Sequence, residues 1–455
     1  MSRIVYFASW LVLCFLLSTF PAKVFSAGLI QDTEIEDTLR EFASPIFKIA
    51  GLKASSVKVY IVNDDSLNAF VTGGQKLFIN SGLLLRSENA NQIIGVIAHE
   101  TGHIAGGHLS RAHGAFSKST ASAILGTVLG GAAAIATGRA DLGAAIVAGG
   151  QTVAQRNFLA YSRTQESSAD HAALGFLDKT GQSARGLLDF MEILEDQELL
   201  SFASQDPYVR SHPLSRERIT TIENHIRNSQ FSDAEDPPQI KKKFTRMQAK
   251  LFAYLRSYGH TRRNYPDSNR TLAARYARAI AEFRHSKLDK AIVIMDGLIR
   301  EYPGDPYFQE MKGQMLYDNG RIPGAIEAYG KAAALLPEAP YIRRDLARAQ
   351  IDSKDPSHLK NAITNLEVAL ANGSRSARNW RFLAIAYGRS GDFSRSYLAL
   401  GEEALLVGKP EQARFQANRA KKAFARGTRE WLQADDILIA ADELARTLKR
   451  REQNK

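Results

Sequence analysis

The C-terminal part of this 455-residue chain repeats itself with a period of 34 residues. Three pairs of identical residues stand one period apart: Ala291 and Ala325, Pro303 and Pro337, and Tyr307 and Tyr341. A period of this length is typical of a helix–turn–helix unit, which buries its apolar face only by stacking on its neighbours. Residues 271–455 are therefore predicted to form stacked helix pairs. The concave surface of such a stack favours a module that binds partners over one that performs chemistry.

The best repeat unit, residues 306–339, fits the tetratricopeptide repeat. Small and aromatic residues stand where the two helices of a unit touch: Gly313, Gly320, Ala325, Tyr329, Ala332 and Pro337. The first helix of a later unit has the same pattern: Trp380, Leu383, Ala384 and Tyr387. That region then departs from the period, because three extra residues fall before Ala362 and Ser396 replaces the expected alanine. We expect about four repeats.

The N-terminal residues 1–27 are organised like a secretory signal peptide. Arg3 precedes an apolar run that extends to Phe20, and small residues suited to cleavage follow. An uncleaved membrane anchor is the alternative, although the apolar run is short for crossing a bilayer. The single cysteine, Cys14, lies in this run, so the mature chain would hold no disulfide and no thiolate metal site. Export without disulfides favours the periplasm of a Gram-negative bacterium.

The composition indicates a soluble globular protein with a basic surface. Hydrophobic residues make up 44% of the chain and charged residues 24%, and the net charge is +11. A basic balance fits nucleic acid, anionic lipid or acidic partners, but the chain has no nucleic-acid-binding motif, and no nucleic acid is expected. A Pro-Pro linker at residues 232–239 precedes a strongly basic segment, residues 241–270. That segment is either a solvated helix face or a docking surface toward an acidic domain or an anionic membrane.

Residues 28–230 combine strand and helix signals. The segment 57–84 has short β-branched and aromatic runs separated by Asn-Asp and Gly-Gly turns, which predicts two or three strands or a hairpin. The segment 90–112 has apolar residues at helical spacing. This part is therefore predicted to be an α+β domain, mostly helical with a small sheet.

The predicted helix carries the sequence HETGH at residues 99–103. His99 and His103 project from one helix face, one turn apart, so that two neutral imidazoles can hold one Zn²⁺ while Glu100 reaches a water at the metal. The flanking residues are apolar or small, as a buried catalytic helix requires. A core helix whose histidines have structural hydrogen bonds is the alternative.

The other histidines near this motif do not fit a ligand pattern. A metzincin would place its third histidine where this chain has Leu109, which excludes that branch. His108 lies about half a turn around the helix from His99 and is expected to face away from it. His108 and His113 are therefore interpreted as structural or solvent-facing residues and not as ligands.

A second helix, predicted over residues 158–178, offers carboxylates instead. Glu166 and Asp170 are four residues apart and share one helix face. Glu166 can complete a site of two histidines and one glutamate, and Asp170 can orient a ligand imidazole through a hydrogen bond. Two acids at this spacing are common on solvated faces, but beside HETGH they indicate a site for one Zn²⁺ per chain.

Together these motifs resemble those of a known protease family. HETGH and the Glu166–Asp170 pair, preceded by Asn68-Ala69-Phe70 and by INSGLL at residues 79–84, are similar to the zinc metallopeptidases that include the heat-shock protease HtpX and the prenyl-protein proteases. With a signal peptide and tetratricopeptide repeats, the chain most resembles the periplasmic β-barrel assembly-enhancing members of that group. The resemblance implies a zincin-like fold, unfolded or misassembled protein substrates, and docking of the repeats on the outer-membrane β-barrel assembly machinery.

The ligand set predicts the reaction. With Zn²⁺ held by His99, His103 and Glu166, the carboxylate of Glu100 would take a proton from the attacking water and pass it to the leaving amine. By analogy with the family, the strand around Asn68–Phe70 would pair with an extended substrate.

The resemblance also gives a role to SHPLSRERI, residues 211–219. The family places a His-Pro followed by an arginine here, and His212 and Arg218 match that pattern. His212 would either stabilise the oxyanion of the transition state or act as an inhibitory fourth zinc ligand. The second role is favoured, because a protease free in the periplasm needs restraint, and Arg218 is then the candidate for stabilising transition-state charge. Without the resemblance, His212 would be a surface histidine in a turn.

A Gly- and Ala-rich segment, residues 119–150, follows the HETGH helix. It is weakly hydrophobic and is interrupted by Arg139 and Asp141. It is interpreted as a lid or as a hairpin that makes peripheral contact with a membrane, with a buried helical hairpin as the alternative.

The chain is thus expected to be an α+β zincin-like metalloprotease domain followed by an all-α repeat domain. The predicted parts are a signal peptide (1–27), the protease domain (28–230), a linker with a basic connecting helix (231–270) and the repeats (271–455). The leading hypothesis is a periplasmic zinc metalloendopeptidase, with or without chaperone activity, that acts on misassembled outer-membrane proteins. The alternative is an interaction or chaperone protein whose repeats act while its protease has little activity.

Overall fold

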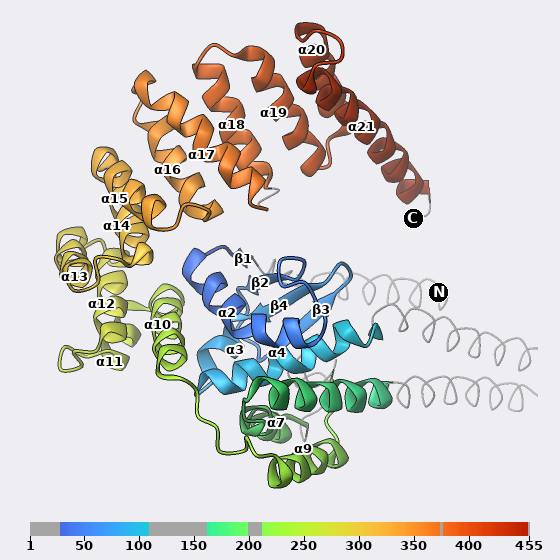
Figure 1. Ribbon diagram of the computed structural model, residues 1–455. Coiled ribbons are helices and arrows are strands. Elements are labelled where there is room, and N and C mark those ends of the chain that lie inside the picture. The colour runs from blue at the N-terminus through green and yellow to red at the C-terminus, as the bar shows by residue number, and fades with distance from the viewer. Residues whose placement is uncertain (1–27, 109–161, 199–211, 374–375, 454–455) are drawn as a thin grey trace, which may run out of the picture.

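The computed structural model describes residues 28–108, 162–198, 212–373 and 376–453. The predictions for the signal segment, Cys14, His113 and residues 119–150 lie outside the described residues. An N-terminal domain, blue to green in Figure 1, lies beside an arc of helix pairs, yellow to red, and α10 (Pro238–Leu255) stands between them. Within the described part of the chain, no helix is both long and apolar enough to cross a membrane.

A small sheet forms part of the N-terminal domain. Its described strands are β1 (Leu29–Ile30), β2 (Lys58–Val62), β3 (Ala69–Thr72) and β4 (Lys76–Asn80). They lie in the order β1-β2-β4-β3, with β2 and β4 parallel and the other neighbours antiparallel. Gly74 and Gln75 have φ angles of 79° and 55°, which suit the tight turn of the β3–β4 hairpin. The segment 57–84 therefore holds three strands, and β3 is the outer strand on its side of this sheet.

Helix α4 (Ala90–Ala105) is the central element of this domain and carries HETGH. The other described helices here are α2 (Thr33–Ile49), α3 (Ser81–Arg86), the helical residues 162–180, α7 (Arg185–Glu198) and α9 (Arg216–Asn228). The side chain of Asn89 caps α4 by accepting a hydrogen bond from the Gln92 backbone N–H. A Cβ on Gly102 would lie 2.7 Å from the carbonyl oxygen of Ala169, so a glycine inside HETGH lets the helix 162–180 approach α4 closely.

Two helices connect the domains, α10 and α11 (Tyr258–Asn264). Lys241 and its neighbours at the start of α10 are exposed, as a solvated face would be, but Lys250 is only 1% exposed. Its ammonium lies 2.7 Å from Asp32 and 3.2 Å from Glu34 at the start of α2. The basic segment is thus partly a docking surface, as the second interpretation proposed, and the acidic group that it meets belongs to the same chain.

Helix pairs make up the rest of the described chain. The helices are α12 (Leu272–Arg284), α13 (Leu288–Glu301), α14 (Pro306–Asp318), α15 (Ile322–Leu335), α16 (Pro340–Asp352), α17 (Leu359–Ala371), α18 (Ala377–Arg389), α19 (Phe393–Leu406), α20 (Pro410–Ala423) and α21 (Arg429–Gln453). The three extra residues before Ala362 correspond to a 3-10 turn, η1 (Pro356–His358). Ser396 keeps the small size of the expected alanine and donates a hydrogen bond to the carbonyl of Ala384.

Close packing between the two helices of a pair explains the small residues of the repeat. A Cβ on Gly313 of α14 would lie 2.7 Å from the ring of Tyr329 on α15, so glycine makes room for the aromatic side chain. The fold prediction is confirmed: an α+β domain with a small sheet precedes an all-α domain of stacked helix pairs.

Candidate metal centre

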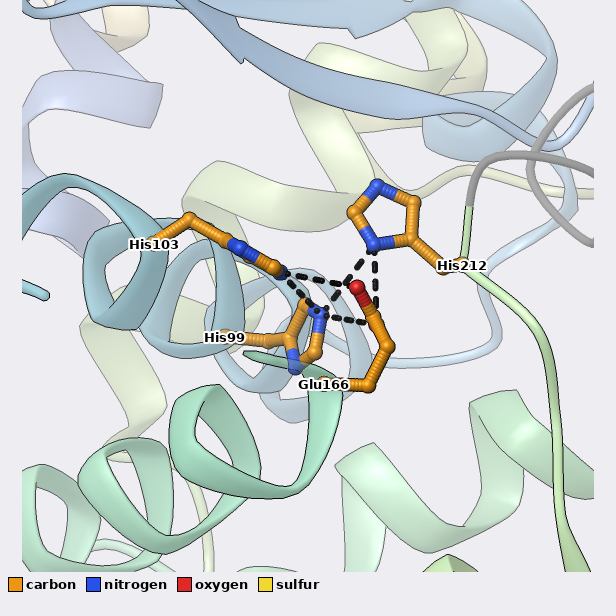
Figure 2. A group of neighbouring side chains, drawn as sticks. All are labelled: His99, His103, Glu166 and His212. Atoms are coloured by element: carbon orange, nitrogen blue, oxygen red, sulfur yellow. Dashed lines mark hydrogen bonds and ion pairs between the residues drawn. The ribbon is translucent and has the colours of Figure 1, made fainter. Parts of the chain in front are cut away.

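Four buried side chains meet beside α4, as Figure 2 shows. They are His99 and His103 of α4, Glu166 of the helix 162–180, and His212 of the segment that precedes α9. One ligand atom from each lies within 4.8 Å of the ligand atoms of the others. The chain therefore brings together, from three separate segments, all four residues that the sequence predicted as metal ligands.

The three residues predicted to hold zinc are closely spaced. The Nε2 atoms of His99 and His103 are 3.1 Å apart. Glu166 places Oε2 at 3.2 Å from Nε2 of His99 and Oε1 at 3.4 Å from Nε2 of His103. Both imidazoles thus present the same nitrogen to one carboxylate, as their spacing of one helical turn and a facing helix allow.

His212 belongs to the same cluster. Its Nδ1 atom lies 3.0 Å from Oε2 of Glu166 and 3.4 Å from Nε2 of His99. The ring's other nitrogen, Nε2, lies 3.5 Å from Oε1 of Glu100. His212 therefore stands between the ligand atoms and Glu100, and it is a buried residue and not a surface histidine in a turn.

Asp170 and Arg218 lie behind His99. Asp170 Oδ1 is 2.8 Å from Nδ1 of His99, on the side of the ring that faces away from the cluster. Arg218 donates two hydrogen bonds to Asp170, from Nε at 2.6 Å and from Nη2 at 2.9 Å. It also donates from Nη1 to the carbonyl of Pro213 at 2.9 Å, which ties the His212-Pro213 segment to α9. This arrangement is that of groups that orient a ligand imidazole.

Burial and charge act against each other on the two histidines of α4. Burial alone would lower the pKa of His99, but the Asp170 and Glu166 carboxylates outweigh it and raise that pKa to about 10. Burial is the main influence on His103 and lowers its pKa to about 4. Burial also opposes ionisation of Glu166 and Asp170, yet hydrogen bonds from their cationic and imidazole neighbours hold the pKa of both below its usual range. The cluster therefore favours positive charge at its centre.

Glu100 differs from these acids. It is fully buried, burial raises its pKa, and among the described residues neither of its oxygens has a hydrogen-bond partner. A buried carboxylate without hydrogen bonds is costly unless something else occupies the space beside it. Three imidazoles, one ionised carboxylate and a buried acid without a hydrogen bond together fit a zinc site with a water next to it.

His108 lies where helical extrapolation did not place it. The helix assumed in that prediction does not continue, because α4 ends at Ala105 and the chain turns at Gly107, whose φ is 62°. His108 is not part of the group of potential metal ligands, in keeping with the structural role expected for it. The His108 ring is buried, and its Nδ1 lies 3.0 Å from Nδ1 of His103. The Gly106-Gly107 pair is the sequence signal that could have predicted this turn.

Comparison with known proteins identifies the domain that holds this cluster. Residues 30–226 match Peptidase family M48. These residues form an M48 peptidase domain. The M48 domain is a zinc metalloprotease domain, so the resemblance described from the motifs is confirmed, and zinc is the metal that its buried ligand set fits.

Similarity to individual proteins extends beyond the M48 domain. The chain is 23% identical over 405 residues to a β-barrel assembly-enhancing protease of Yersinia pestis, covering 85% of this chain and 79% of that protein. It is 23% identical over 392 residues to the protein of that name in Escherichia coli K12, with the same coverage. The metalloprotease YcaL of E. coli K12 is 32% identical over 170 residues, which are 37% of this chain and 61% of that protein.

Proposed function

We propose that this protein is a zinc endopeptidase of the periplasm that cleaves misassembled outer-membrane β-barrel proteins. The observation that carries the proposal is the buried cluster of His99, His103, Glu166 and His212 with Glu100 beside it, in an M48 domain. The substrate class is supported by two relatives that are named for enhancing β-barrel assembly and that align with 85% of this chain.

His99, His103 and Glu166 would hold the metal in this proposal. Bound Zn²⁺ supplies a Lewis acid that makes water nucleophilic near neutral pH. Asp170 accepts a hydrogen bond from the Nδ1–H of His99, which leaves the Nε2 lone pair of that ring available to the metal. Arg218 holds Asp170 in place through its own hydrogen bonds. Arg218 has its donors directed to Asp170, Glu166 and Pro213, which supports positioning as its role ahead of direct stabilisation of transition-state charge.

Glu100 would act as the general base and then as the general acid. It accepts the proton of the attacking water and delivers that proton to the leaving amine. Its burial supports this double role, because burial raises the pKa of Glu100 and so makes its carboxylate a better proton acceptor.

His212 would keep the enzyme latent. Its Nδ1 atom is as close to Glu166 as the other ligand nitrogens are, and its Nε2 atom lies 3.5 Å from Glu100. A substrate and its attacking water need that space, so His212 must move before cleavage. An oxyanion-stabilising group would instead lie beside the ligand set and leave this space open.

Strand β3 would bind the substrate. It packs against α4, which carries His99 and His103, and its outer edge has no other described strand beside it, so an extended peptide could add to that edge. Asn68, directly before β3, has a buried side-chain oxygen without a hydrogen-bond partner among the described residues, which an incoming N–H could satisfy.

The helix pairs would recruit unfolded proteins and the outer-membrane assembly machinery. Secretion through residues 1–27 and membrane contact through residues 119–150 belong to the same proposal, as do the four predicted parts of the chain. The second candidate, a chaperone with little proteolytic activity, is favoured by the large share of the chain in helix pairs.

One experiment separates the two functions. The purified mature protein is assayed for metal content and for cleavage of casein and of an unfolded β-barrel precursor. We expect one zinc per chain and cleavage that stops in Glu100→Gln. A zinc-loaded protein that prevents aggregation of the precursor without cleaving it would favour the chaperone.

A further inference from the structure

The end of α4 places a second imidazole directly behind His103. Nδ1 of His108 lies 3.0 Å from Nδ1 of His103, and the two rings meet edge to face, with centroids 4.9 Å apart and an interplanar angle of 85°. His108 is 5% exposed. The contact is on the side of the His103 ring opposite to Nε2, the nitrogen that faces Glu166 and His99.

Two glycines allow His108 to reach His103. Gly107 adopts a φ of 62°, in the left-handed region, which turns the chain back toward α4. A Cβ on Gly106 would lie 2.3 Å from Nε2 of His108, so any other residue there would displace the His108 ring. The position of His108 is therefore built into the backbone.

We propose that His108 is a positioning residue that fixes the tautomer and orientation of His103. Two ring nitrogens 3.0 Å apart form a hydrogen bond only if one of them carries a hydrogen. When His103 Nδ1–H donates to His108, the lone pair of His103 Nε2 remains available for the metal. This inference rests on the proposed role of His103 as a zinc ligand.

The same function is performed for His99 by a different group. Asp170 accepts from Nδ1 of His99 at 2.8 Å, whereas His103 has an imidazole in the equivalent place. The centre already contains the carboxylates of Glu100, Glu166 and Asp170, all buried. A neutral acceptor behind His103 orients the ring without adding a further buried negative charge.

The test measures zinc affinity and the visible spectrum of the Co²⁺-substituted full-length chain. His108→Leu retains the volume but lacks the acceptor, and we expect its zinc dissociation constant to rise by about 10–100-fold, with altered Co²⁺ bands. His108→Asn places Oδ1 near the former Nδ1 and should restore most of the affinity. His260→Leu, at an exposed histidine of α11, is the control and should bind zinc like wild type.

Gly106→Ala tests the same contact without changing the His108 side chain. It should weaken zinc binding in the wild-type background by displacing His108, but should add little to His108→Leu, since the contact is already lost. Wild-type zinc affinity and Co²⁺ spectrum in His108→Leu would overturn the positioning role. Absence of zinc binding in the wild-type chain would instead overturn the proposed function, so the two failures are distinguishable.

Discussion

The protein buries charge in two places, and the two differ in how that charge is compensated. At the domain junction, Lys250 lies 2.7 Å from Asp32 and 3.2 Å from Glu34. Arg246 donates to Asp305 at 2.9 Å and also pairs with Glu34. Each of these cations touches two carboxylates, so the junction is a compensated network whose role is to hold the repeats against α2.

The metal centre is not compensated in this way. Arg218 pairs with Asp170 and Glu166 there, while Glu100 has no hydrogen bond among the described residues and has a ring nitrogen of His212 at 3.5 Å. A buried acid without a hydrogen bond, beside a group of potential metal ligands, indicates a functional site. Burial of charge alone therefore does not indicate a site, whereas a buried carboxyl group without a hydrogen bond does.

The largest predicted effect is the loss of activity in Glu100→Gln. Without a general base, peptide cleavage should fall by roughly 10²–10⁴-fold. Because the variant removes a buried acid that lacks hydrogen bonds, its thermal stability should be equal to or above that of wild type, and its zinc content unchanged. Cleavage assays, differential scanning calorimetry and metal analysis check the three parts, and retained cleavage would remove Glu100 from the mechanism.

A substitution in the domain junction should lower stability and leave the metal centre unaffected. Lys250→Met leaves buried Asp32 and Glu34 without their ammonium partner and should lower the free energy of unfolding by about 3–5 kcal/mol. Zinc affinity of the folded protein should not change. The control is Lys243→Met on the same helix, an exposed residue, for which denaturant unfolding should show a change of about 0.5 kcal/mol or less. Equal effects of the two substitutions would mean that the junction network does not hold the domains together.

His212→Ala should raise cleavage. If the closed arrangement outweighs the open one about tenfold, the variant gains about tenfold in basal rate at equal zinc occupancy. A fall of ~10²-fold or more would instead assign His212 to the oxyanion. An unchanged rate would leave His212 with a structural role only.

The smallest expected effect concerns Glu36, next to the junction. Burial raises its pKa from 4.5 to about 7. The folded chain therefore binds this proton more tightly than the unfolded chain, and the free energy of unfolding falls as pH rises from 4.5 to 7. Glu36→Gln should flatten that decline in urea unfolding measured across this pH range. The control is Glu192→Gln at an exposed position, which should leave the pH dependence of unfolding unchanged. An equal slope in wild type and Glu36→Gln would contradict the raised pKa of Glu36.

Sequence spacing predicted those features that depend on local periodicity. Four-residue spacing placed His99 with His103 and Glu166 with Asp170, and the 34-residue period predicted the helix pairs. It could not place His108, because the helix was assumed to continue past Ala105. It also could not reveal the burial of Lys250, whose partner Asp32 is 218 positions away in the chain. Contacts that depend on where an element ends, or on a partner from another domain, are not encoded in local spacing.

The position of the metal would show whether this cluster is the zinc site. A crystal structure of Glu100→Gln, purified with zinc and measured across the zinc absorption edge, would show each zinc atom as an anomalous peak. We expect one peak per chain, bonded to His99, His103 and Glu166, with His212 as the fourth ligand in the latent state. A chain without a peak there, or with its zinc held by other residues, would contradict the assignment of this cluster as the catalytic centre.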